Sequence, residues 1–183
     1  MADLVLSGNT SGAITISAPS VAGTNTITLP ASTGTVMVNG PAFSAYANAS
    51  QTISLATLTK VSLNTEVFDT ASAFDKDTNY RFTPQVAGYY QINAKIRGTS
   101  TSNGMNLLIV AIYKNGSSYC NSQYNTSSPV YAQESNVSAV VYMNGSTDYI
   151  ELYGAIYGSG TPSFNYVSSD ITSSMTGCLV RSA

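Results

Sequence analysis

An alternation of apolar and polar residues from Tyr90 to Ile96 is the sequence feature that most constrains the fold of this chain. Tyr90, Ile92, Ala94 and Ile96 are separated by single polar residues. Because successive side chains of a strand point to opposite faces, this period of two predicts a half-buried β-strand. Upstream, Pro84 fixes φ and Gly88 permits φ > 0, so we expect a turn between Phe82 and this strand. At Gly88 we expect either a positive φ or a tight approach of another backbone segment.

Other parts of the chain show the same strand-like pattern. Further strands are predicted for Met105 to Lys114, Val137 to Tyr142, Asp148 to Tyr157 and Ser174 to Val180. The first two end at Asn115-Gly116 and Asn144-Gly145, and an Asn-Gly pair between apolar runs is the strongest short signal for a hairpin. Strong helix formers nowhere recur at a spacing of three to four residues over three turns. The chain is therefore predicted to be all-β.

The spacing of three of these residues resembles a known signature. Phe82, Gly88 and Tyr90 stand as Phe-x-x-x-x-x-Gly-x-Tyr, which resembles the C1q and tumour-necrosis-factor-like (TNF-like) globular heads. Other segments also resemble that family. They are the Lys114-Asn115-Gly116 turn, the opening segment Pro41 to Ala45, the segment Lys60 to Asp75, and the terminal strand, in which Met175 stands where phenylalanine is usual. The resemblance covers residues 41–183. It implies an antiparallel jelly roll that assembles as a homotrimer, with residues 79–94 forming an edge-to-centre hairpin.

The first forty residues form a different unit. Short alternating segments recur at Leu4 to Leu6, Ala13 to Ile16, Thr26 to Leu29 and Thr35 to Val38. Each has only one or two apolar residues per face, so we expect this module, residues 1–40, to pack against copies of itself or against another surface. Its Ser/Thr/Gly-rich sequence resembles a sequence cassette of bacteriophage tail-fibre and other virion proteins. That resemblance implies attachment to capsid or tail proteins, or trimerisation; the alternative is a linker.

Catalytic side chains are scarce. The chain has no histidine, which removes Ser-His-Asp, Cys-His and His-metal sites. The one tight group of carboxylates is Glu66, Asp69, Asp75 and Asp77. We interpret it as a polar turn with solvated acids rather than an acid–base pair. A calcium loop starting at Asp75 lacks the required glycine and glutamate. We expect no enzymatic activity, no metal and no cofactor, although the resemblance leaves calcium at a trimer apex open.

Charge and cysteine usage exclude further classes. The net charge is −2 and the seven cations are scattered, so we expect no nucleic-acid binding. No apolar stretch approaches the ~20 residues that span a bilayer, so we expect no membrane insertion. Neither a basic region nor an apolar region follows Met1, so we expect no secretory leader, and this fits a virion protein made in the cytoplasm of a bacterial host. We expect Cys120 and Cys178 to be free thiols, with Cys178 buried.

Tyrosine is the candidate recognition residue, because the chain has thirteen tyrosines and no tryptophan. Tyr149, Tyr153 and Tyr157 share one face of one strand, and we expect that face in the core or along the trimer seam. The segments Asn115 to Ser135 and Gly158 to Ser169 have the composition of long loops. Their tyrosines, Tyr119, Tyr124, Tyr131 and Tyr166, are the candidates for contact with a sugar or a partner protein.

The sequence therefore predicts a non-enzymatic surface protein of a bacteriophage virion. In the first interpretation it is a trimeric short fibre or fibre tip, whose head binds a host surface glycan or protein. In the alternative it is a trimeric capsid decoration protein or head fibre that is bound to the capsid lattice through residues 1–40.

Overall fold

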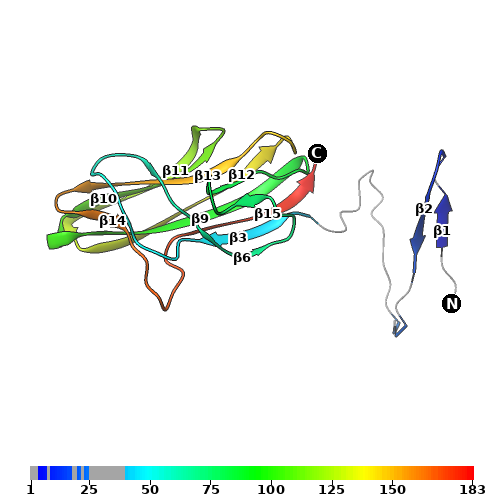
Figure 1. Ribbon diagram of the computed structural model, residues 1–183, viewed down its shortest axis with the longest axis horizontal. Helices are drawn as coiled ribbons and strands as arrows, with labels where there is room; N and C mark the ends of the chain where they lie inside the picture. The colour runs from blue at the N-terminus through cyan, green and yellow to red at the C-terminus, as the bar shows by residue number, and fades with distance from the viewer. Residues whose placement is uncertain (1–3, 8, 18–19, 22, 25–39) are drawn as a thin grey trace. The chain divides into compact units, whose positions relative to one another are not determined.

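The computed structural model describes residues 4–7, 9–17, 20–21, 23–24 and 40–183 (Figure 1). The chain divides into two compact units, Met1–Gly34 and Thr35–Ala183. In the first unit β1 (Leu4–Ser7) and β2 (Ala13–Ile16) form an antiparallel hairpin in which Leu4 pairs with Ile16. The segments expected at Thr26 to Leu29 and Thr35 to Val38 lie outside the described residues.

The second unit, which we call the head, is built from two antiparallel sheets that face each other (Figure 1). The seven-stranded sheet has the order β4 (Gln51–Thr52), β14 (Pro162–Phe164), β9 (Gly88–Ser100), β15 (Ser174–Ser182), β3 (Ala42–Tyr46) and β6 (Thr65–Asp69), and β12 (Ala132–Met143) pairs with the other edge of β9. The six-stranded sheet has the order β11 (Ser117–Val130), β10 (Met105–Lys114), β13 (Ile150–Gly158), β8 (Arg81–Phe82) and β7 (Phe74–Asp75), and β5 (Thr59–Lys60) also pairs with β13. A single 3-10 turn, Thr101–Asn103, lies between β9 and β10. The predicted all-β class is confirmed.

The core lies between the two sheets and follows the predicted alternation. In β9, Tyr90, Ile92, Ala94 and Ile96 are buried, and the polar residues between them are more exposed. The facing strands contribute Leu108, Val110 and Ile112 from β10, and Ile150, Leu152 and Ile156 from β13. One side of each strand therefore supplies the apolar area that stabilises the fold, and the other side remains available for contacts outside the head.

A cluster of three aromatic rings links the two sheets. Phe43 of β3 stacks on Phe82 of β8 with 4.2 Å between ring centroids. Phe82 in turn meets Tyr90 of β9 at 5.6 Å in an edge-to-face arrangement. The Tyr90 hydroxyl donates a hydrogen bond to the Val86 carbonyl oxygen at 2.8 Å. Burial raises the pKa of Tyr90 to about 12, because the charged phenolate would have to leave water.

The two Asn-Gly pairs have different roles. Asn115 and Gly116 have φ values of 52° and 76° and connect the paired strands β10 and β11, so this predicted hairpin is confirmed. Asn144-Gly145 instead connects β12 of the seven-stranded sheet to β13 of the six-stranded sheet. In that pair only Gly145 has a positive φ, of 72°. A hairpin at the second pair is therefore wrong, because the chain crosses between the sheets there.

The segment from Phe82 to Tyr90 also crosses between the sheets. β8 pairs with β7 and β13, whereas β9 pairs with β12, β14 and β15, so the expected edge-to-centre hairpin is wrong. Gly88 does not have a positive φ. It is instead a site of close approach, since a Cβ atom there would collide with the Arg181 carbonyl oxygen and lie 2.6 Å from Leu179 Cδ1. Of the two expectations for Gly88, the structure shows the tight approach.

Candidate recognition site

Tyr119 and Tyr124, two of the four candidate tyrosines, lie in a strand rather than in a loop. β11 runs from Ser117, which pairs with Lys114, to Val130, which pairs with Met105. The predicted loop from Asn115 to Ser135 is therefore wrong over most of its length. Its Ser- and Asn-rich composition favours a loop, but the long apolar strand β10 supplies backbone partners along most of the segment. Pro129 is tolerated because β11 is the edge strand of its sheet.

The structure does not gather the four candidate tyrosines. Tyr119 lies near the Asn115-Gly116 turn, whereas Tyr131 lies at the opposite end of the head, between β11 and β12. Both are about half exposed, and the Tyr119 hydroxyl donates to the Val140 carbonyl oxygen at 3.2 Å. Tyr124 pairs with Leu108 along the edge strand. Tyr131 is the single residue that connects β11 to β12, and Tyr166 lies in the longer loop that connects β14 to β15.

Tyr149, Tyr153 and Tyr157 do not belong to the core of the head. The buried face of this segment carries Ile150, Leu152 and Ile156, so the three tyrosines are on the outward face of the six-stranded sheet. Two of them are already covered on one side. Tyr153 stacks on Tyr113 with 4.1 Å between centroids, and the Arg81 guanidinium lies 4.5 Å from the centre of the Tyr149 ring. Core packing is therefore wrong for these residues, and an intermolecular seam remains a proposal.

Tyr166 lines a groove that we call the Tyr166 groove. It has a volume of about 470 Å³ and lies between the loop 165–172 and the strands β3 and β6. Its walls contain Tyr46, Glu66, Val67, Tyr166, Ser168, Ser169, Asp170 and Ile171. A volume in this range is typical of small-ligand sites. Sequence reasoning missed Tyr46 as a partner of Tyr166, because only the folded sheet brings residues so far apart in sequence together.

Hydrogen bonds at its base hold the loop wall of this groove. The Tyr166 amide donates to Ser50 Oγ at 2.9 Å, and the Asn165 amide donates to the Arg97 carbonyl oxygen at 2.8 Å. The Thr172 hydroxyl donates back to the Asn165 carbonyl oxygen at 2.6 Å, which closes the loop. Within the loop, Asp170 N bonds the Val167 carbonyl oxygen. These bonds fix the backbone of the loop at Tyr166 without a ligand.

The acidic residues Glu66, Asp69, Asp75 and Asp77 do not converge on one point. Asp69 accepts hydrogen bonds from the amides of Ala71 and Phe74, at 3.1 and 2.7 Å. Asp75 accepts from the Thr78 amide at 2.9 Å and from the Asn79 side chain at 2.6 Å, and these donors lower the pKa of Asp75. Such bonds stabilise turns. Among the described residues no three His, Cys, Asp or Glu side chains gather as metal ligands would.

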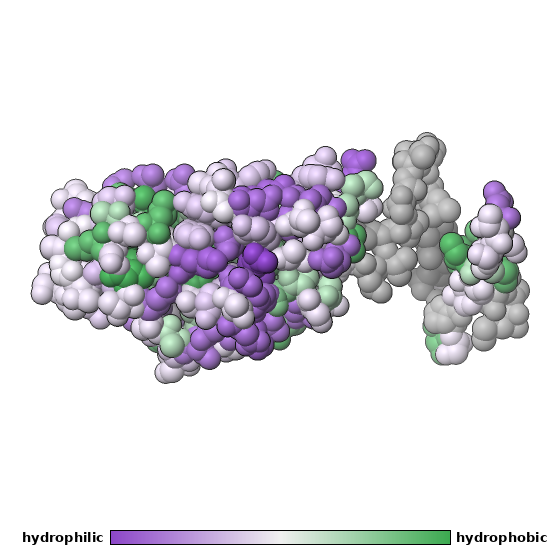
Figure 2. Space-filling model, turned by 45° about the horizontal axis from the view of Figure 1, so that its top comes forward, coloured by the Kyte–Doolittle hydropathy of each residue, from purple (hydrophilic) through white to green (hydrophobic). Residues whose placement is uncertain are grey.

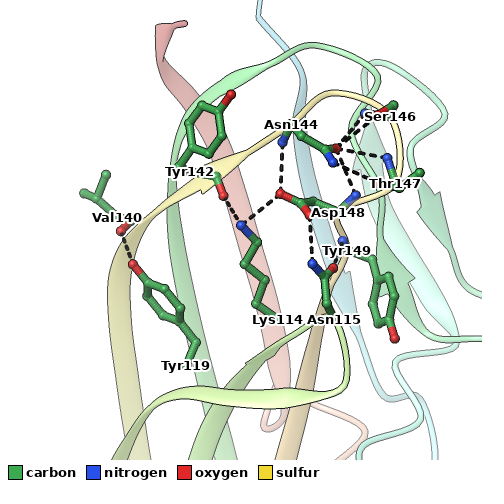
Figure 3. Close-up of polar contacts among 10 residues, drawn as sticks. All are labelled: Lys114, Asn115, Tyr119, Val140, Tyr142, Asn144, Ser146, Thr147, Asp148 and Tyr149. Atoms are coloured by element: carbon green, nitrogen blue, oxygen red, sulfur yellow. Dashed lines mark hydrogen bonds and ion pairs between the residues drawn. The ribbon is translucent and has the colours of Figure 1, made fainter.

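A polar network around the buried carboxylate of Asp148 fixes one end of the head (Figure 3). Asp148 accepts from Lys114 Nζ at 2.8 Å, from Asn115 Nδ2 at 2.7 Å and from the Asn144 amide at 3.0 Å. The hydrogen bonds from Lys114 and Asn115 lower the pKa of the Asp148 carboxyl. Asn144 Oδ1 accepts from the amides of the loop that follows it. Every charge here has a partner, so the network joins two connections of the sandwich and presents no open binding group.

The outward face of the seven-stranded sheet carries exposed apolar side chains near the C-terminus. Tyr89 and Tyr142 pair across β9 and β12 with ring centroids 5.4 Å apart, and they are 44% and 43% exposed. Val140 and Val180 are also more than half exposed, and a groove of about 520 Å³ runs beside Tyr89, Tyr142 and Val180. Cys178 is on this face and is exposed, so its expected burial is wrong. Met175 and Leu179, an odd number of residues away, occupy the buried face of β15 instead.

The β1–β2 hairpin exposes apolar side chains as well, some of which are visible in Figure 2. Leu4, Val5, Leu6, Ile14 and Ile16 are all more than half exposed. Since adjacent residues of a strand point to opposite faces, Val5 and Leu6 expose apolar surface on both sides of the hairpin. A two-stranded hairpin with no covered face is at best marginally stable alone in water.

Comparisons with known proteins identify the fold. No family model matches the sequence, and no curated protein matches it. Solved structures do match. Eiger TNF from S. frugiperda aligns with a TM-score of 0.57 at 9% identity, over 79% of this chain and 93% of that chain. Murine APRIL at pH 5.0 aligns with a TM-score of 0.58 at 8% identity, over 78% of this chain and 100% of that chain. The head therefore has a TNF-like jelly-roll fold.

Among the described residues no helix is long and apolar enough to cross a membrane.

Proposed function

We propose that this chain is a non-enzymatic surface protein of a bacteriophage virion. Residues 1–40 attach it to the capsid or tail, and residues 41–183 form its exposed head. The observation that carries the proposal is the β1–β2 hairpin, whose apolar side chains are exposed on both faces. A segment with regular strand pairing and no core of its own needs a partner surface. The similarity of its sequence to phage fibre cassettes makes a virion protein the partner we propose.

The head is proposed to be a homotrimer. Support comes from the outward face of the seven-stranded sheet, where Tyr89, Val140, Tyr142 and Val180 form an exposed apolar surface. Contiguous apolar surface of this kind is typical of protein–protein contacts. Closed symmetry would bury that surface and would leave no open chain of contacts. The resemblance to C1q and TNF-like heads implies the same oligomeric state.

Adsorption to the host is the first of two proposed roles. In that role the protein is a short fibre or fibre tip, and the head binds a surface glycan or protein. The Tyr166 groove supports this role, because two tyrosines and several polar groups line an open groove of about 470 Å³. Rigid tyrosine rings supply contact area at low entropic cost.

Capsid decoration is the second proposed role, and one observation favours it. Tyr119 and Tyr124 lie along the edge strand β11 and Tyr131 follows the end of that strand, so the three do not converge on one recognition loop. In this role the hairpin unit binds the capsid lattice, and the head adds stability to the particle. Residues 1–40 are proposed to determine where the protein sits on the virion, and the head is proposed to bind the host. The two roles can therefore be separated by experiment.

Electron microscopy of intact virions that are labelled with an antibody against the head tests the proposal. Label at the tail tip, in small multiples of three copies, supports adsorption. Label over the whole capsid supports decoration. If purified particles carry no label, while the infected cell contains the protein, the virion assignment is wrong.

A further inference from the structure

We propose that the Tyr166 groove binds a neutral saccharide unit of a host surface glycan, an inference that rests on the adsorption role. The proposal concerns the groove between the loop 165–172 and strands β3 and β6. It assigns the head a defined ligand site, and it separates Tyr166 from the other candidate tyrosines.

The rings of Tyr46 and Tyr166 are the first part of the argument. Both line the groove, and neither stacks on another aromatic ring or on a cation among the described residues. By contrast, Tyr153 is covered by Tyr113, and Tyr149 is covered by Arg81. A sugar ring presents C–H groups on its faces and hydroxyls on its edge. An aromatic ring that is not already stacked on another ring or a cation suits the C–H face of a sugar, because the aromatic face carries negative charge density.

The polar groups of the groove are the second part. Glu66 and Asp170 form no ion pair with a described residue, and the hydroxyls of Ser168 and Ser169 make no described hydrogen bond. An ionised carboxylate accepts hydrogen bonds through both oxygens, which matches neighbouring sugar hydroxyls, and a serine hydroxyl both donates and accepts. The groove therefore supplies acceptors and donors beside its two rings.

Charge decides which sugars fit. Glu66 and Asp170 give the groove two negative charges, and no cation lines it. A uronic acid, a sialic acid or a phosphorylated sugar would bring a further negative charge beside them, and like charges at short range are repelled. A neutral hexose or N-acetylhexosamine has no such cost. The loop wall is already fixed by the bonds to Ser50 and Arg97, so little ordering is needed when the sugar binds.

Isothermal titration of the full-length protein with neutral trisaccharides tests the site. The probes are the trisaccharides of glucose, galactose, mannose and N-acetylglucosamine, with trigalacturonic acid as the acidic counterpart. At least one neutral trisaccharide should bind and the acidic one should not. Failure of every neutral trisaccharide to bind, or tighter binding of trigalacturonic acid, overturns the proposal.

Variants place the binding in the groove. Tyr166→Ala and Glu66→Gln should each weaken binding about tenfold, which corresponds to the loss of one good contact. Tyr124→Ala and Asp77→Asn are matched controls, since they change an exposed tyrosine and an exposed carboxylate elsewhere on the head. Their affinity should equal that of the unchanged protein. Glu66→Gln preserves the shape of the side chain. It therefore still tests the groove if the Tyr166→Ala variant fails to fold. Equal affinity in all four variants overturns the site.

Binding to host cells distinguishes this inference from the adsorption role. If virions with Tyr166→Ala adsorb normally, the groove assignment is wrong and the adsorption role stands. If head binding to cells survives removal of surface polysaccharide but is lost after protease treatment, the ligand is a protein and the saccharide proposal is wrong. If the Tyr166→Ala protein is instead missing from the virions, the head takes part in attachment, and this contradicts the proposed function itself.

Discussion

The ring of Phe82 in β8 meets the ring of Tyr90 in β9 edge to face, with 5.6 Å between the centroids, and the two rings belong to different sheets. The residues between them cross from one sheet to the other, and the Tyr90 hydroxyl binds the backbone of this crossing at Val86. Edge-to-face pairs add about 0.5–1.5 kcal/mol beyond the burial of their area. Phe82 and Tyr90, whose spacing resembles the C1q and TNF-like signature, thus join the two layers of the head.

Replacement of Gly88 by valine should destabilise the head by ~1–3 kcal/mol, since the new side chain must displace backbone and packed side chains. The nearest atoms are the Arg181 carbonyl oxygen and Leu179 Cδ1. Chemical denaturation measures the change. Ser138→Val, at an exposed strand position of β12, is the control and should have little effect. An unchanged midpoint for Gly88→Val would show that β15 does not pack against this residue.

Removal of the Tyr90 hydroxyl by Tyr90→Phe should cost ~0.5–1.5 kcal/mol at neutral pH, because one hydrogen bond to Val86 is lost. The variant should also change the dependence of stability on pH. The folded pKa of about 12 lies above the ordinary value of 10.0, so the folded state holds its proton longer than the unfolded state. The stabilisation is therefore complete below pH 10 and is lost as the pH rises from about 10 to 12.

Unfolding free energies measured across that range for both proteins test the effect. The unchanged protein should lose more stability than Tyr90→Phe. The informative quantity is the difference between the two curves, because it isolates the contribution of Tyr90. Parallel curves would mean that Tyr90 is not buried as described.

Asp148→Asn should lower the free energy of unfolding by ~1–3 kcal/mol at neutral pH, since it leaves Lys114 without its carboxylate partner. The folded pKa of Asp148 lies below the ordinary value of 3.8, so its contribution is present above that pH and is lost as the pH falls below it. The variant should therefore be less sensitive to acid. Asp77→Asn, which removes an exposed pair with Lys76, is the control and should change neither quantity appreciably. Equal acid sensitivity in Asp148→Asn and the unchanged protein would contradict the network.

Local signals in the sequence predicted local structure well. The Asn115-Gly116 turn needs only its own two backbone conformations, and the alternation from Tyr90 to Ile96 needs only one buried face. The partner of a strand depends on residues far away in the chain. For this reason the sequence did not distinguish a hairpin from a crossing between sheets at Phe82 to Gly88, nor an edge strand from a loop at Tyr119 and Tyr124.

The candidate site was only partly predictable. Tyr166 was selected by its loop composition, but its neighbours Tyr46 and Glu66 reach the groove through sheet pairing of β3 with β6 and β15. The alternation of β15 predicts that Cys178 is exposed. Met175, Gly177 and Leu179 occupy the buried positions of this strand, and Cys178 lies between two of them. The tendency of free cysteines to be buried was there a weaker guide than strand parity.

The proposed homotrimer predicts a sedimentation mass three times that of the monomer. Val140→Lys places a charge on the exposed apolar face of the seven-stranded sheet and should dissociate the trimer, because an unpaired charge in an interface is costly. Tyr124→Lys on β11 is the control and should leave the mass unchanged. A stable monomer of the unchanged protein at micromolar concentration would contradict the proposal.

Deletion of residues 1–40 tests the central claim, that the chain has an attachment unit and an exposed head. The hairpin exposes its apolar residues and the head has its own core, so the truncated chain should still fold. The measurement is the copy number of the chain in purified virions, with thermal melting and sedimentation of the same protein as controls for folding and assembly. The account predicts a folded, trimeric head that is absent from the particles. A truncated head that joins virions at the normal copy number would contradict it and would make the head itself the docking surface.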